Sequence, residues 1–240
     1  MAGGAYVALS GMRTRIDQLD RVAADLANVN TAGYKAERAS TLAAERPDFR
    51  AALQSAVDVV ARQGRLDLRN GALTPTGRDF DFALEGRGFF VVQTPSGERY
   101  TRNGQFDRQA DGTLATSDGL PVLGTNGPIK IGRGEVSVDA DGTIRAGGVV
   151  AGKLRVVDVP DADNLRREDH GRFRYAGSGA LPAASDVAVR SGLLEHSNVS
   201  VVERMVQLTE VGRSFEALQR GLNVLMNDVD QRAITEFGRR

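Results

Sequence analysis

The chain has 240 residues, which is enough for one large domain or two small ones, and 31 basic residues balance 31 acidic ones. This zero net charge argues against nucleic acid or an anionic membrane as the main partner. The absence of cysteine excludes disulfides, thiolate metal sites and a cysteine nucleophile.

The first predicted element is a long helix near residues 5–30. Its apolar residues recur at alternating intervals of three and four, the heptad pattern of a helix with one apolar seam. The seam consists of Leu9, Met12, Ile16, Leu19, Ala23 and Leu26. This pattern suits either an amphipathic helix on a globular core or a seam that receives another long helix.

A turn motif is predicted where this helix ends, within 26-LANVNTAGYKAERAS-40. The motif consists of Asn28, Asn30, Thr31, Gly33 and Tyr34. The asparagines can bond the last helical carbonyls, the threonine can cap the turn, and Gly33 can take positive φ without steric cost. Tyr34 offers an apolar anchor with a polar tip, while Lys35 is expected to return to solvent or to subunit contacts. An ordinary helix C-cap would explain the same residues.

An antiparallel all-β domain is predicted for residues 79–185, after a connector at 36–78 in which 51-AALQSAVDVVARQG-64 fits a short helix. The run 89-FFVVQ-93 indicates a buried strand, and Asn-Gly and Asp-Gly pairs between short apolar runs indicate hairpins. The segments 109-QADGTLA-115 and 139-DADGTIR-145 are alike, which we interpret as shared hairpin chemistry rather than duplication.

A second long helix is predicted after Ser197 and Asn198, which are good N-cap residues. Its apolar residues also recur at intervals of three and four, with a phase slip beside Gly212. This second seam consists of Val201, Met205, Leu208, Val211, Phe215, Leu218, Leu222, Leu225 and Val229. The two seams are expected to pack with each other or with copies from neighbouring molecules.

No enzyme is predicted. The two histidines, His170 and His196, lie in different segments without a metal-ligand pattern. The sequence 139-DADG-142 lacks the glycine and glutamate spacing of a calcium loop, and there is no nucleophile elbow, Walker loop or dinucleotide fingerprint. We therefore expect no catalytic residues, metal, cofactor or small-molecule substrate.

Three parts of the chain, in the same order, resemble the bacterial flagellar rod and hook proteins. The N-terminal signature is carried by 6-YVALSGM-12 and 26-LANVNTAGYKAE-37, and the C-terminal signature by 191-SGLLEHSNVSVVERMVQLTEVGRSFEA-217. The β middle is similar in 81-DFALEGRGFFVVQTPSGERYTRNGQFDRQADGTLATSDGLPVLGTNGPI-129. Within the family the chain looks most like a proximal rod protein, with a distal rod protein as the alternative.

The resemblance implies a structural subunit of the basal-body rod in the periplasm, which transmits torque from motor to hook. It further implies that the terminal helices form the inner layer of a helical tube with the β domain outside, and that the turn motif directs the chain outward. The implied partners are proximal and distal rod proteins, copies of this chain and the flagellar export apparatus. Export without a cleaved signal peptide agrees with an N-terminus that lacks a secretory pattern.

The predicted fold class is α+β, with long N- and C-terminal coiled-coil helices flanking an antiparallel all-β middle domain. The predicted divisions are residues 1–35 (axial helix and turn motif), 36–78 (connector), 79–185 (β domain) and 186–240 (axial helix and tail). A second function class remains open, a soluble glycan- or peptidoglycan-binding module, which would need an exposed aromatic cluster on the β surface. The third, a hydrolase, has no supporting motif.

Overall fold

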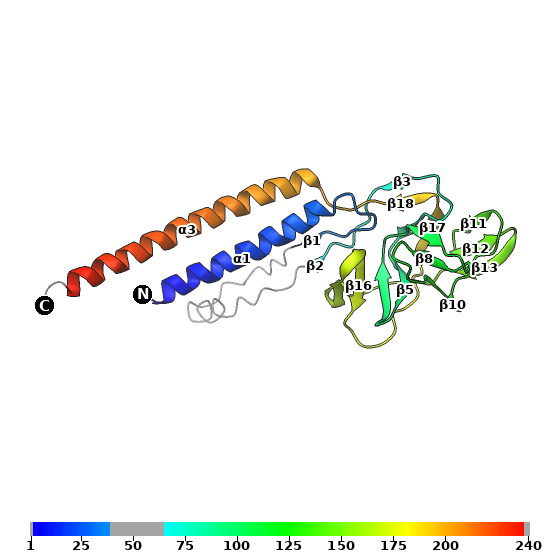
Figure 1. The fold of residues 1–240 in the computed structure, drawn as a ribbon, viewed down its shortest axis with the longest axis horizontal. Helices are drawn as coiled ribbons and strands as arrows, with labels where there is room; N and C mark the ends of the chain where they lie inside the picture. Colours follow the sequence, from blue (N-terminus) through cyan, green and yellow to red (C-terminus); the bar gives the residue numbers. More distant parts are fainter. Residues whose placement is uncertain (1, 39–64, 238–240) are drawn as a thin grey trace. The chain divides into compact units, whose positions relative to one another are not determined.

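The computed structural model describes residues 2–38 and 65–237, and it describes side chains for residues 9–38 and 65–224. Two compact units make up the chain (Figure 1). The helical unit comprises residues 1–27, 38–64 and 200–240, and the β unit comprises residues 28–37 and 65–199. The predicted short helix at 51–64 lies outside the described residues.

In the helical unit, α1 (Ala2–Ala27) and α3 (Val201–Phe237) lie side by side (Figure 1). They run antiparallel, because the end of α1 meets the start of α3: Arg204 Nε is 3.0 Å from Asp25 Oδ2. Earlier in α1, a Cβ built on Gly11 would lie 3.6 Å from Leu218 Cδ1. Among the described side chains of α1, from residue 9 onward, Val22 and Asp25 are buried, and Asp25 pairs with Arg204 of α3.

The first turn of α3 is capped by Ser200, whose Oγ accepts from Glu203 N at 3.4 Å and whose carbonyl accepts from Arg204 N at 3.0 Å. Ser197 and Asn198, the predicted N-cap residues, lie before this cap. The prediction placed the cap two or three residues too early, because Ser197, Asn198 and Ser200 all favour the N-cap position and spacing alone does not distinguish them.

The fold class predicted from the sequence is wrong as stated. The described residues contain two α-helices and many short antiparallel strands, and the helix pair is not the predicted coiled coil. Several seam side chains are exposed in the single chain: Leu9 is 55% exposed, Ile16 45% and Met205 56%. The buried Val22 and Asp25 lie outside the predicted seam. Apolar spacing identifies the apolar face of a helix, but here the Asp25–Arg204 ion pair and the close approach of Gly11 to Leu218 show which face of α1 meets α3.

The largest sheet of the β unit has five strands in the order β14-β5-β6-β16-β15. These strands are β14 (Val156–Val157), β5 (Phe89–Thr94), β6 (Gly97–Thr101), β16 (Arg172–Tyr175) and β15 (Leu165–Arg167). All neighbouring pairs are antiparallel, with Val91 opposite Tyr100 and Phe173 opposite Tyr100 on the other side. Two single turns of 3-10 helix, η1 (Ala162–Asn164) and η2 (Asp169–Gly171), precede β15 and β16.

The β strands also form smaller sheets, which are antiparallel in every pair apart from β1 and β2, whose direction is not described. β4 (Phe82–Gly86) pairs with β17 (Val187–Ser191), β3 (Leu73–Pro75) with β18 (Leu193–Glu195), β7 (Phe106–Arg108) with β8 (Leu114–Thr116), and β9 (Leu123–Gly124) with β10 (Gly127–Pro128). β11 (Val136–Val138), β12 (Thr143–Ala146) and β13 (Val149–Lys153) form a three-stranded sheet, and β1 (Glu37–Arg38) pairs with β2 (Arg65–Leu66). Strands β2, β3, β17 and β18 thus add to the β unit from outside residues 79–185.

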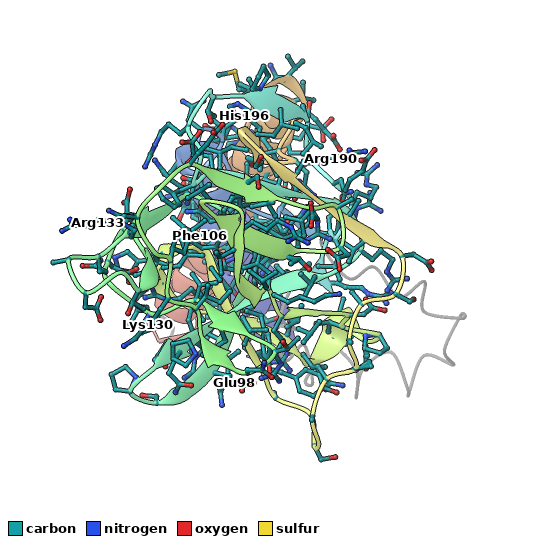
Figure 2. All side chains as sticks on the ribbon, turned by 90° about the vertical axis from the view of Figure 1, so that its right-hand side faces the viewer. Glu98, Phe106, Lys130, Arg133, Arg190 and His196 are labelled. Atoms are coloured by element: carbon teal, nitrogen blue, oxygen red, sulfur yellow. The ribbon has the colours of Figure 1, made fainter. Side chains whose placement is uncertain are left out.

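Strand β5 is buried on both faces, as the run 89-FFVVQ-93 predicted. Successive side chains of a strand point to opposite sides, so Phe90 and Val92 enter one hydrophobic cluster while Phe89 and Val91 enter another. Figure 2 shows Phe106, from the first cluster, within the β unit, with the charged side chains of Lys130, Arg133 and Arg190 at its periphery. The rings of Phe90 and Phe106 meet edge-on with centroids 5.3 Å apart.

The two similar Asp-Gly-Thr segments form the same turn. Thr113 N donates to Asp111 Oδ1 at 2.9 Å, and Thr143 N donates to Asp141 Oδ1 at 3.1 Å. The intervening glycines have φ of +85° and +84°, a conformation that glycine adopts readily. The carbonyl of each turn glycine also accepts from a later residue: Gly112 O from Ile131 N and Gly142 O from Leu154 N, both at 2.8 Å. The two turns therefore also share the backbone hydrogen bond that the glycine carbonyl accepts from a later part of the chain.

Candidate functional site

The turn motif folds into the β unit directly after α1 ends at Ala27. Thr31 N donates to Asn28 O at 3.1 Å, and the Thr31 hydroxyl donates to Asn28 Oδ1 at the same distance. Gly33 has φ of +67°, as its predicted left-handed conformation requires. A Cβ at Gly33 would lie 2.2 Å from Asn103 N and 2.3 Å from Arg102 C, so space as well as conformation demands glycine there.

Tyr34 anchors the segment, and its exposed fraction is only 3%. Its side chain belongs to a small buried cluster with Ala36 and Val199, against which Val29 packs. The Arg167 guanidinium lies 4.3 Å from the centre of the Tyr34 ring, a cation–π geometry. The same guanidinium donates to the Tyr34 hydroxyl and to the Lys35 carbonyl. Residues 34–36 are therefore held against β15 by both apolar and polar contacts.

Lys35 was expected to return to solvent or subunit contacts, and this prediction is wrong. Its side chain is fully buried, with Nζ 2.6 Å from Glu195 Oε1 and 2.7 Å from the Arg69 carbonyl. Burial lowers the pKa of the Lys35 ammonium, while the Glu195 carboxylate acts in the opposite direction. A buried lysine needs a charged partner, and this one comes from a strand 160 positions away in the sequence.

Glu195 is the centre of this buried cluster. One carboxylate oxygen accepts from Lys35 Nζ and from Gly71 N at 2.8 Å, and the other accepts from Arg102 Nη1 at 3.2 Å. Arg102 also donates to the Gly86 carbonyl at 2.8 Å, and burial lowers the pKa of its guanidinium. The backbone carbonyl of Glu195 accepts from Gly33 N at 2.7 Å. Glu195 thus bonds to Gly33 and Lys35 of the turn motif, to Gly71 in the segment before β3, and to Arg102 just after β6.

Asn198 braces the same place from the C-terminal side. Its Oδ1 accepts from Ala36 N at 2.7 Å, and its Nδ2 donates to the carbonyls of Asp67 at 2.7 Å and Arg69 at 3.0 Å. Its backbone N donates to the Tyr34 carbonyl at 3.3 Å. Residues 33–36, 67–71 and 195–198 therefore meet at one point, which we call the junction. All three segments belong to the β unit.

The sequence indicated the turn motif, and the structure shows the contacts of Asn28, Thr31, Gly33 and Tyr34. The sequence did not indicate Glu195, Arg102, Arg167 or the contacts of Asn198. The available signal was a charged residue that ends an apolar strand, Leu193-Leu194-Glu195, beside the exposed His196. An analysis of apolar periodicity predicts that a charged residue such as Glu195 is exposed to solvent. Only the three-dimensional structure shows that Glu195 is 1% exposed.

The seam residues fall into two groups. Leu9, Ile16, Ala23, Val201, Met205 and Leu208 are exposed, whereas Met12, Leu19, Leu26, Val211, Phe215, Leu218 and Leu222 are partly buried; the side chain of Val229 lies outside the described residues. The side chain of Leu225 lies outside the described residues. Two further residues of α3, which the seam omitted, are also open: Val202 is 75% exposed and Val206 53%. An apolar stripe of Val202, Met205 and Val206, at helical spacing i, i+3, i+4, therefore runs along the start of α3.

Within residues 2–38 and 65–237, no group of three or more histidine and acidic side chains could hold a metal ion. The same described part contains no helix that is both long and apolar enough to cross a membrane. The features that remain as candidates are the junction in the β unit and the exposed apolar faces of α1 and α3 in the helical unit.

Models of two known protein families match segments of this chain. The model of the "Flagellar hook protein FlgE/F/G D1 domain" matches residues 83–146, and that of the "Flagellar basal body rod FlgEFG protein C-terminal" matches residues 190–234. These matches define the chain as a structural protein of the flagellar hook and rod class.

Whole-chain relatives narrow the class further. The chain is 33% identical to the flagellar basal-body rod protein FlgF of Caulobacter vibrioides, with 92% of each chain covered. It is 35% identical to FlgF of Salmonella typhimurium, covering 88% of this chain and 89% of the relative. It is 31% identical to the rod protein FlgG of Bacillus subtilis, covering 88% and 90%. The chain belongs to the family of flagellar basal-body rod proteins and is FlgF-like.

Proposed function

We propose that this chain is a structural subunit of the proximal segment of the flagellar basal-body rod and has no enzymatic role. The observation that carries the proposal is the similarity to FlgF proteins along nearly the whole chain, with 92% of both chains covered for the Caulobacter relative. A likeness of this extent includes the helices as well as the β unit. The segment of the rod is the finer part of the proposal, since FlgG of Bacillus subtilis is also similar.

The partners that we propose are other rod proteins and copies of this chain. The support is the open apolar surface of the helical unit: Leu9 and Ile16 on α1, and the α3 stripe of Val202, Met205 and Val206. Apolar side chains gathered on a helix face gain stability when a partner covers them. In a rod these faces would contact neighbouring subunits through a heterologous interface repeated by a screw operation.

We further propose that the chain reaches the periplasm through the flagellar export apparatus without a cleaved signal peptide. Membership of the flagellar basal-body rod protein family supports this route. The glycan-binding alternative has no supporting observation. Within the described side chains the exposed large apolar residues are Leu, Ile, Val and Met, so this surface offers no aromatic platform.

The test is complementation of a strain from which the gene has been deleted. The wild-type chain, with an epitope inserted after Gly119, which lies in a turn with open space around it, should restore motility and appear in purified basal bodies. Density for this chain in a cryo-EM map of those basal bodies should lie in the proximal rod. Basal bodies of full length that lack the chain would refute the proposal, and density in the distal rod would refute the assignment of the segment.

A further inference from the structure

Four polar groups of the motif residues 33–36 bond to the C-terminal side of the junction. Gly33 N donates to Glu195 O, the Tyr34 carbonyl accepts from Asn198 N, Lys35 Nζ donates to Glu195 Oε1, and Ala36 N donates to Asn198 Oδ1. Buried backbone and charged groups that lose their partners carry a large desolvation penalty. The motif can therefore dock only where residues 195–198 are already in place.

Electrostatics make Glu195 the critical member. Lys35, Arg102 and Glu195 are each at most 2% exposed, so two cations share one carboxylate. The other carboxylate that acts on Lys35 is Asp67, and both of its oxygens already accept from the Arg69 guanidinium, at 3.1 and 2.7 Å. Glu195 is thus the group that offsets the buried positive charge of the motif.

We propose that Glu195 is a positioning residue that couples the two ends of the β unit, so that the N-terminal motif docks only after the C-terminal strand β18 has joined β3. Strand β18 brings Glu195 opposite Leu73 in β3, and this pairing aims the carboxylate at Lys35 and Gly71 N. The residues that precede α3 and those that follow α1 along the chain are thereby fixed together or released together. The inference rests on the proposed function only for its consequence in rod assembly.

Amide hydrogen exchange of the purified full-length chain tests the coupling. Glu195→Gln replaces a carboxylate with a neutral group of the same size and raises the formal charge of the three-residue cluster from +1 to +2. Breaking a buried pair by neutralising one partner should speed exchange at the Gly33 and Ala36 amides by roughly 100-fold. Exchange within β5 and β6 should change far less. Glu98→Gln is the matched control, because Glu98 pairs with Arg155 at a half-exposed site.

A second variant tests the charge directly. Lys35→Met combined with Glu195→Gln returns the formal charge of the cluster to +1 while keeping a side chain of similar length at residue 35. This double variant should slow exchange at Gly33 and Ala36 by about tenfold relative to Glu195→Gln alone, which a cluster that acts only by packing would not do.

The proposal is overturned if Glu195→Gln exchanges no faster at these amides than Glu98→Gln, or if the double variant gives no recovery. If Glu195→Gln does not fold, a folded and protected double variant supports the coupling, and an unfolded one overturns it. Complete basal bodies built from a Glu195→Gln chain with a released motif would overturn the role in assembly while leaving rod membership intact. Failure of the wild-type chain to enter basal bodies would instead count against the proposed function.

Discussion

Replacing Gly33 by alanine tests how closely the motif is fitted to the β unit. The new Cβ would have to occupy a space 2.2 Å from Asn103 N, 2.3 Å from Arg102 C and 2.6 Å from Arg102 O. These neighbours are backbone atoms, which cannot rotate away as a side-chain end can. Residue 33 would also have to keep φ near +67°, a region that residues with a Cβ disfavour.

The expected loss of stability has two parts. The left-handed conformation costs an alanine about 1–2 kcal/mol. Moving the motif away from the Arg102 backbone would also lengthen the 2.7 Å bond from Gly33 N to Glu195 O, which is worth about 1 kcal/mol, and would disturb the Lys35–Glu195 pair behind it. We expect a total of roughly 2–4 kcal/mol, a large share of the stability of an ordinary domain.

Gly77→Ala is the matched control, since Gly77 has φ of +71° and no atom within 4 Å of a built Cβ. Gly77→Ala should lose only the part of the stability that comes from the left-handed backbone conformation, about 1–2 kcal/mol. Urea unfolding of both variants, followed by circular dichroism, measures the difference, which should be at least about 1 kcal/mol. In the flagellum, Gly33→Ala should reduce complete basal bodies more than Gly77→Ala does. Equal losses of stability in the two variants would refute the argument that close approach of the backbones selects glycine at residue 33.

Three further predictions concern other parts of the chain. Met205→Asp places a charge on the exposed α3 stripe, so it should leave the thermal melting of the monomer nearly unchanged and reduce rod assembly strongly; normal basal-body numbers would reject the stripe as an interface. Asp25→Ala removes the buried carboxylate of the Arg204 pair and should destabilise the helical unit by about 3 kcal/mol in far-ultraviolet circular dichroism, whereas the exposed Asp20→Ala should have little effect. Bonds from Lys153 and Thr143 lower the pKa of Asp141 from 3.8 to about 2, so its stabilising effect should be present above pH 3.8 and be lost as the pH falls through about 2. Asp141→Asn should abolish that part of the acid dependence of the melting temperature, and an unchanged acid profile would argue against it.

Local features of the β unit could be predicted from sequence because they depend on neighbouring residues. The Asp-Gly-Thr turns are set by a carboxylate, a glycine and a hydroxyl within three positions, and the run 89-FFVVQ-93 identifies β5 by composition alone. Gly33 was found for the same reason, since positive φ after a helix is a local requirement.

Features that join distant residues could not be predicted in this way. Lys35 was expected in solvent or in subunit contacts because a lysine is almost never fully buried without a charged partner, and that partner is Glu195, far along the chain. Heptad spacing does not specify which side of α1 an antiparallel α3 meets. The contacts of Asp25 with Arg204, and of Gly11 close to Leu218, decide that side.

The junction also determines the mechanical path through the subunit. A tension that enters along residues 28–33 reaches residues 195–198 through the 2.7 Å bond from Gly33 N to Glu195 O and the 2.6 Å pair of Lys35 and Glu195. From there it leaves along Val199 toward α3. This route bypasses β5 and the two hydrophobic clusters on either side of it. The rest of the β unit, outside the junction, therefore lies off this path, and its packing does not have to bear the pull that passes between the ends of the chain.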